Sequence, residues 1–174
     1  MPVPQIGFSS AERFRRLTNE LKKECLEIAK NEMAAQAERL VQLMKAKCPV
    51  NADPPPQAGL LRDSIGWTFG EPPTKRGLMG SVRTRPGNSN EIIANVYAGN
   101  NEAFYARWVE FGTQAHSIGK GADISRSKRQ SRGGQHPGSP AQPFFWPSYR
   151  LLKNSMRAAV KQKLISAIEK RSSL

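Results

Sequence analysis

The stretch FYARWVEFGTQ, residues 104–114, places five large apolar side chains within eight residues and then stops at a glycine. Phe104, Trp108 and Phe111 recur at the spacing i, i+4, i+7, which is typical of one face of a helix. We therefore expect a short helix whose aromatic face is wedged on a sheet. Gly112 fits the left-handed position that commonly follows the last residue of a helix.

Three strand-like runs precede this stretch, separated by residues that favour turns. They read SIGWTFGE (64–71), GLMGSVRTR (77–85) and EIIANVYAG (91–99). Alternation of apolar and polar residues and the turn formers between the runs predict strands. The sequence therefore predicts an antiparallel three-stranded meander, in which Trp67 and Phe69 share one face.

Residues 9–47 carry apolar residues at spacings of three and four, which predicts one amphipathic helix. Ser9 or Ser10 suits the N-cap, and Pro49 ends the helix. Its length of about 58 Å, at 1.5 Å per residue, exceeds what a compact domain of this size covers. We expect either that part of the helix packs on a neighbouring subunit or that it breaks in its Ala-rich middle.

A second long helix is predicted near the C-terminus, with Pro147 in its first turn. Its apolar stripe can lie on the sheet or on the first helix. The predicted fold is α+β: a long N-terminal helix, a small antiparallel sheet with a short aromatic helix, a long basic loop and a long C-terminal helix. We expect one domain over residues 1–174, divided into 10–48, 49–113, 114–142 and 143–174.

Positive charge is concentrated in the last third of the chain. The net charge is +13, and residues 114–174 hold +10 of it. Residues 114–142 contain too little apolar surface to fix a backbone, so we expect a flexible loop. Its cations, and those on the following helix, either contact DNA phosphates without reading sequence, dock on an acidic protein, or form a solvated face. The candidates are Lys120, Arg126, Lys128, Arg129, Arg132, Lys153, Arg157 and Lys161.

Residues for catalysis or metal binding do not cluster in the sequence. His116 and His136 are the only histidines, and no cysteine or carboxylate group accompanies them at metal-ligand spacing. Ser64 and Thr113 have no identifiable base beside them. Glu110 is expected to pair with Arg107 or with the turn at residues 112–113. We therefore predict no catalytic residues, no metal and no cofactor, and a protein that is not an enzyme.

Cys25 and Cys48 would lie about 34 Å apart on one straight helix, so they cannot form a disulfide within it. Two free thiols suit a reducing compartment. We expect no membrane contact, because no run of about 18 apolar residues exists and the first residues lack the pattern of a secretory signal.

Three short motifs occur in order along the chain: AGLLRDSI (58–65), YARWVEFGT (105–113) and PFFWPS (143–148). Together they resemble the tailed-phage neck and tail-completion family, over roughly residues 20–170. Ala58 and Ser148 stand where that family usually has Thr and Ala, and the loop between the last two motifs is longer than usual. The scaffold residues carried over from the motifs are Gly59, Leu60, Arg62, Ser64, Ile65, Tyr105, Ala106, Val109, Glu110, Phe111, Gly112, Thr113, Pro143, Phe144 and Pro147.

The resemblance implies a head–tail joining domain in a structural virion protein, assembled in the host cytoplasm. Such a protein would form a homo-oligomeric ring, six-fold by analogy, at the head–tail junction. Its partners would be copies of itself, tail terminator or tail tube proteins, connector proteins and the packaged DNA. The alternative from charge alone is a free nucleic-acid-binding protein or a metal-dependent nuclease, and a nuclease would need clustered carboxylates or histidines.

Overall fold

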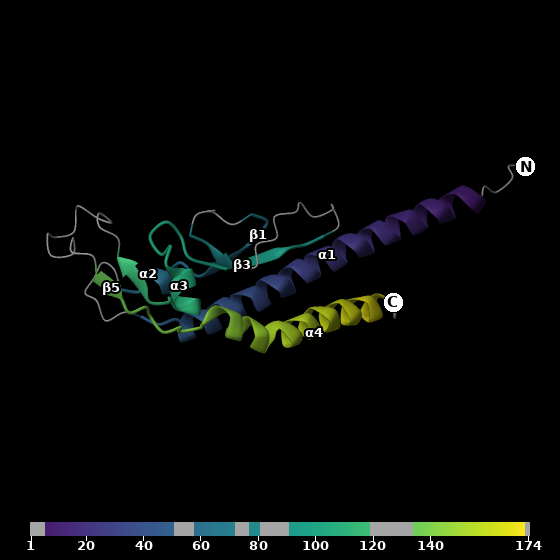
Figure 1. Cartoon of the computed structure of the whole chain (residues 1–174). Coiled ribbons are helices and arrows are strands. Elements are labelled where there is room, and N and C mark those ends of the chain that lie inside the picture. The colour runs from purple at the N-terminus through teal and green to yellow at the C-terminus, as the bar shows by residue number, and fades with distance from the viewer. Residues whose placement is uncertain (1–5, 51–57, 72–76, 81–90, 119–133, 173–174) are drawn as a thin grey trace, which may run out of the picture.

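A computed structural model describes residues 6–50, 58–71, 77–80, 91–118 and 134–172. Within these residues the fold is α+β, with long helices near both ends and small β elements between them (Figure 1). This confirms the predicted class and the predicted order of helix, sheet, short helix and helix.

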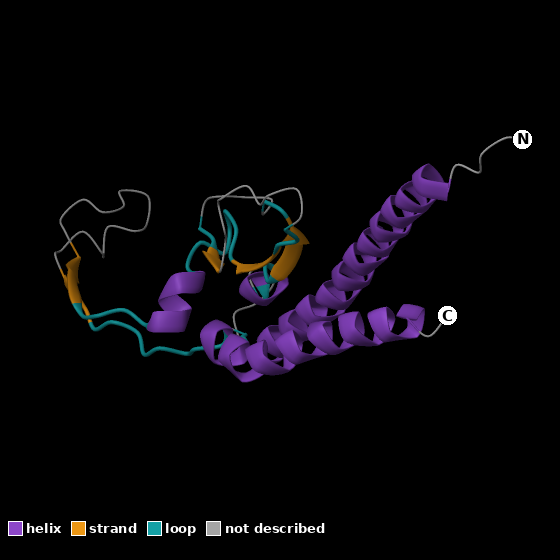
Figure 2. Ribbon diagram, turned by 90° about the vertical axis from the view of Figure 1, so that its right-hand side faces the viewer, coloured by secondary structure: helices purple, strands orange, loops and turns teal. Residues whose placement is uncertain are grey.

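Helix α1 (Ile6–Lys47) is continuous over 42 residues, or about 63 Å. It begins before Ser9 and Ser10, so the predicted N-cap is wrong, and the alternative of a break in the Ala-rich middle is wrong as well. Helix α4 (Phe145–Ser172) runs back along α1 in the opposite direction (Figure 1). The two helices diverge toward their free ends (Figure 2). Arg171, near the end of α4, pairs with Glu20 and Glu24 of α1.

The sheet contains β1 (Gly66–Phe69), β2 (Met79–Gly80) and β3 (Ala94–Ala98) in the order β1-β3-β2. Both β1 and β2 pair with β3 in antiparallel fashion. Three strands are confirmed, but the meander is wrong, because a meander would place β2 in the centre. Strand β3 is the longest and most buried, so pairing both of its edges satisfies its backbone, whereas the two-residue β2 suits an edge.

The ends of the predicted flexible loop form a two-stranded hairpin. Strands β4 (His116–Ile118) and β5 (Gly134–His136) pair with His116 opposite His136. An isolated bridge between Thr113 and Ser139 continues this pairing toward α3. The ends of the predicted flexible loop therefore pair as strands, which the sequence analysis did not predict. The central part of the predicted loop, residues 119–133, lies outside the described residues.

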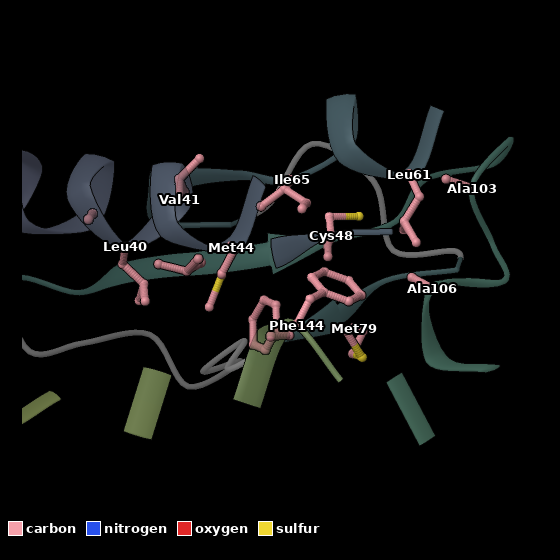
Figure 3. Packing of buried hydrophobic residues seen from close by; sticks show 14 of the residues in the cluster. Leu40, Val41, Met44, Cys48, Leu61, Ile65, Met79, Ala103, Ala106 and Phe144 are labelled. Carbon is pink, nitrogen blue, oxygen red and sulfur yellow. The ribbon is translucent and has the colours of Figure 1, made fainter. Parts of the chain in front are cut away.

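The core lies where the C-terminal third of α1 meets the sheet, the short helix α2 (Leu60–Asp63) and the start of α4 (Figure 3). The Trp67 indole N–H donates to Glu38 Oε2 at 3.1 Å and fastens β1 to α1. Trp67 and Phe69 lie on one face with ring centroids 5.1 Å apart, as predicted. Buried apolar side chains from these elements include Leu40, Val41, Met44, Leu61, Ile65, Met79, Val96 and Phe144.

Both cysteines are free thiols, as predicted; Cys48 is buried and Cys25 is half-buried. Across the described ranges, no helix is both long enough and apolar enough to span a bilayer.

Candidate functional site

The carboxylate of Glu110 joins the short helix α3 (Ala106–Phe111) to the start of α4. Its Oε2 accepts hydrogen bonds from the backbone N–H groups of Phe144 at 2.8 Å and Phe145 at 2.9 Å. Its Oε1 accepts from the N–H of Trp146 at 2.9 Å. Glu110 is only 3% exposed, and these three bonds satisfy a carboxylate that would otherwise be costly to bury.

This arrangement completes the N-terminus of α4. The first backbone N–H groups of a helix have no partner within the helix and favour negative charge. Here three of them bind Glu110, and the next residue, Pro147, has no N–H to satisfy. The expected pairing of Glu110 with Arg107 or the turn at 112–113 is therefore wrong. The helix dipole and three converging donors outcompete a partner on the surface of α3.

Ser64 in the first motif holds a second junction. Its hydroxyl donates to the carbonyl of Leu61 at 2.6 Å and accepts from the N–H of Gly99 at 2.9 Å. Gly59 precedes α2 with φ 86°, in the left-handed region that glycine adopts without strain. The first motif thus turns the chain and fixes the end of β3.

Gly112 ends α3 as predicted, but with φ 71° and ψ 179°, not in the left-handed helical conformation. A Cβ at this position would lie 2.7 Å from the carbonyl oxygen of Ser139. Only glycine therefore allows the chain at residue 112 to approach the segment before α4 this closely. The backbone bond from Gln142 N to Val109 O, 2.8 Å long, closes the same junction.

The aromatic face of α3 points outward, which is the opposite of the prediction. Phe104, Trp108 and Phe111 are 53%, 53% and 57% exposed, whereas Ala106 and Glu110 are buried. Phe104 packs edge-on against Trp108 at 5.5 Å, so the aromatic rings cover one another and not the sheet. We call Phe104, Trp108 and Phe111 the aromatic patch.

A cleft of about 830 Å³ adjoins the aromatic patch and lies between α2, α3 and the base of the hairpin. Trp108 and Tyr105 line it from α3, and burial raises the pKa of the Tyr105 phenol. His116 and His136 line it from the hairpin, with their rings stacked at 5.0 Å. The cleft is therefore aromatic in character, which suits a partner side chain or ring.

The histidine pair is a structural contact. His136 Nδ1 accepts a hydrogen bond from the Gly138 N–H at 3.0 Å, so that nitrogen is already engaged. Within the described ranges, no three His, Cys, Asp or Glu side chains come together as a metal site would require.

Comparison with known families decides the identity of the scaffold. The model of one family, described as "Bacteriophage HK97-gp10, putative tail-component", matches residues 12–112, more than half of the chain. The chain belongs to the HK97-gp10-like family. No curated protein and no solved structure matches it significantly.

Family membership confirms the resemblance to tailed-phage tail proteins. The matched segment of this HK97-gp10-like chain begins in α1 and ends at Gly112, so it contains the first motif and all of the second except Thr113. The third motif, at residues 143–148, lies beyond the match. Glu110 connects the two parts physically, because its carboxylate binds the backbone of that third motif.

The predicted cationic residues of the HK97-gp10-like chain fall into two groups. Arg157 and Lys161 are exposed on α4, four residues apart, and Lys153 is half-buried one turn earlier. The other five lie outside the described residues: Lys120, Arg126, Lys128, Arg129 and Arg132.

Sequence reasoning did not find the Glu110 cap or the outward aromatic patch. A usable signal existed in the spacing of Ala103, Ala106 and Glu110, which recur at i, i+3, i+7 and are all buried. Ala106 and Glu110 form the inner face of α3, and Ala103 lies just before the helix. Small side chains on one face allow the backbone of α3 to approach Gly99 closely.

Proposed function

We propose that this chain is a structural virion protein of a tailed bacteriophage that forms a six-fold ring at the head–tail junction and joins the tail to the connector. The observation that carries the proposal is apolar surface left in water on two separate helices, α1 and α3. Phe14 and Leu17 are exposed on α1, and Trp108 and Phe111 are exposed on α3. Exposed apolar clusters of this kind mark protein-binding surfaces.

The site at α3 supports a docking role. The hydrogen bonds of Glu110 and the close approach of Gly112 to Ser139 fix α3 against the start of α4, so the aromatic patch is presented on a rigid support. Large aromatic side chains beside a cleft are the usual anchors of protein interfaces. We propose that the aromatic patch and the cleft beside it receive a neighbouring virion protein of the tail or the connector.

The positive surface is proposed to face a polyanion. Arg157 and Lys161 project from α4, and residues 114–174 hold most of the net charge of +13. In a ring around a channel, such cations would contact packaged DNA through its phosphates, without reading its sequence. We propose that Lys153 and the loop cations contribute to this same surface, and that residues 1–174 act as one head–tail joining domain without catalysis.

The proposal is tested by electron microscopy of tails from a phage that lacks this protein, before and after the purified protein is added. We expect ring-shaped density at the head-proximal end of the tail and recovery of joining to heads. A protein that leaves these tails bare and unjoined would contradict the proposal.

The alternative of a free nucleic-acid-binding protein makes a different prediction in solution. A free binder would hold duplex DNA as a monomer, with an affinity that falls steeply with salt concentration. We expect weak binding to DNA by the isolated chain and a stronger contact only when copies are arranged around DNA. Tight binding by the monomer would favour the alternative.

A further inference from the structure

An apolar groove of about 570 Å³ lies between α1, β3 and α4, where the two helices diverge (Figure 2). Its α4 side runs from Phe145 to Ile168, which is about 35 Å at 1.5 Å per residue. Ile165 and Ile168 are 42% and 47% exposed, so apolar surface is left in water along this side. An elongated apolar groove of this kind is the usual receptor for one face of a helix.

The side chains that line the groove can adapt to a partner. Three of the five methionines of the chain line it, Met33 and Met44 from α1 and Met156 from α4. Methionine is flexible and polarisable, and it is frequent on surfaces that accept different apolar partners. The lining therefore suits the apolar face of an amphipathic helix.

The charged residues that line the groove are positive. They are Arg157 and Lys161, which are exposed on α4 four residues apart, and no described Asp or Glu lines the groove beside them. Side chains at i and i+4 lie on the same side of a helix, one turn apart. A partner segment with carboxylates one turn apart would pair with both cations, whereas a cationic segment would be repelled.

The groove also contains a polar atom without a partner. Gln36 lines the groove, and its side-chain oxygen is buried and accepts no hydrogen bond from any described residue. Its amide nitrogen already donates to Glu32 at 2.8 Å. Because buried acceptors in proteins are nearly always paired, this oxygen points to an N–H or O–H donor that arrives with a partner.

Duplex DNA would satisfy only part of this surface. Its phosphates would pair with Arg157 and Lys161, but they would leave the apolar lining uncovered and the oxygen of Gln36 without a donor. A protein helix that carries carboxylates beside an apolar face, and a hydroxyl or amide at their border, would satisfy all three features.

We propose that the groove receives an acidic amphipathic helix of a neighbouring virion protein. The apolar face of that helix covers Ile165 and Ile168, and its carboxylates pair with Arg157 and Lys161. This inference rests on the proposed function and names the polyanion that these two cations meet. Lys153, which does not line the groove, remains part of the surface proposed for packaged DNA.

The test uses two fluorescent synthetic peptides of about 20 residues, which would span about 30 Å as helices. The amphipathic peptide carries leucine at i, i+3, i+4 and i+7, glutamate on the other face and serine at the border. The scrambled peptide has the same composition and charge without an apolar face. Fluorescence anisotropy should show that the wild-type protein binds the amphipathic peptide at least about tenfold more tightly. Equal binding of the two peptides, or no binding of either, would overturn the inference.

The cations are tested by Arg157→Ala with Lys161→Ala, which should weaken binding of the amphipathic peptide at least about tenfold. Arg150→Ala with Lys163→Ala is the matched control, because it removes the same charge from exposed positions on α4 outside the groove. We expect this control to bind like the wild type. If Arg157 and Lys161 serve only DNA, their variant loses affinity for a labelled DNA duplex and keeps its affinity for the peptide, and the inference is overturned.

The apolar side is tested by Ile165→Asp with Ile168→Asp, which should also abolish most of the peptide binding. Leu151→Asp is its control, because Leu151 is 64% exposed on α4 but does not line the groove. Since these side chains are largely exposed, all variants should keep the circular dichroism of the wild type. A folded Ile165 and Ile168 variant that binds the peptide as well as the Leu151 control would show that the groove is not the site.

Failure of this inference is distinguishable from failure of the proposed function. If the purified protein forms rings on tails but the groove variants bind the peptide like the wild type, the proposed function stands and the inference fails. If the peptide binds as expected while tails stay bare, the groove binds acidic helices and the proposed function fails.

Discussion

Glu110 Oε2 lies 2.8 Å from the backbone nitrogen of Phe144, although the two residues are 34 positions apart. Phe144 is fully buried in the core, so this bond fixes the start of α4 against the core. The bond connects the short aromatic helix to the long basic helix. The aromatic patch beside α3 and the cations of α4 are therefore positioned relative to each other by one buried carboxylate.

Replacing Glu110 by Gln should lower the free energy of unfolding by about 2–3 kcal/mol, because the charged acceptor is lost and an amide N–H₂ group faces backbone donors. Chemical denaturation followed by circular dichroism measures this. Glu102→Gln, at an exposed position, is the control and should change stability by less than about 0.5 kcal/mol. Equal free energies of unfolding for the two variants would show that the hydrogen bonds of Glu110 do not stabilise the fold.

Gly112→Ala should destabilise the fold by about 2 kcal/mol more than Gly70→Ala. Both glycines have positive φ, 71° and 83°, so both substitutions strain the backbone. Only at Gly112 would the new Cβ meet backbone atoms, the nearest at 2.7 Å, whereas nothing lies within 4 Å at Gly70. Thermal unfolding of both variants tests this. Indistinguishable midpoints would show that a side chain fits where Gly112 approaches Ser139.

Trp108→Ala should reduce stability by no more than about 1 kcal/mol, because the side chain is 53% exposed. Phe144→Ala, at a fully buried position, should cost about 3–5 kcal/mol. The Trp108 variant should nevertheless lose its partner, which co-sedimentation with purified tails measures. Normal attachment of that variant would argue against the aromatic patch as a docking surface.

Burial raises the pKa of the Cys48 thiol from 9.0 to about 11. The unfolded chain therefore loses this proton at lower pH than the folded chain, so the stability from Cys48 is complete below about pH 9 and declines toward pH 11. We expect Cys48→Ala to flatten this alkaline decline in the free energy of unfolding. A variant whose decline matches that of the wild type would show that other groups cause it.

The same burial should protect Cys48 from alkylation. In the folded protein at pH near 8, iodoacetamide should modify the half-buried Cys25 first. Mass spectrometry of timed samples distinguishes the two sites, and faster labelling of Cys48 would contradict its burial.

The long helices could be predicted because apolar residues at spacings of three and four indicate an amphipathic helix. The stripe on α4 that includes Leu152 and Met156 does face α1 and the core, as the spacing indicates. The strand order could not be predicted in the same way. Neighbouring runs with turn formers between them favour a meander, whereas in the structure β3, the longest strand, pairs with β1 on one edge and β2 on the other.

The orientation of α3 was predicted wrongly for a physical reason. A sequence pattern cannot tell which of two faces is inward when small residues allow a closer approach than aromatic ones. Gly99 leaves no room for a Cβ, which would lie 2.3 Å from the Gly77 carbonyl oxygen, and Ala106 packs beside it. This tight packing selects the alanine face and leaves Trp108 exposed.

The burial of Glu110 could not be predicted either. A glutamate in an aromatic segment ordinarily stays in water, and its three donors come from residues more than 30 positions away. Only the fold brings them together.

We propose that neighbours in the virion complete this tail-component chain. Electron microscopy of mutant tails, with and without the purified protein, is the decisive test. We expect a closed ring of copies at the head-proximal end of each tail. Tails that remain bare beside a protein that sediments as a lone monomer would contradict it.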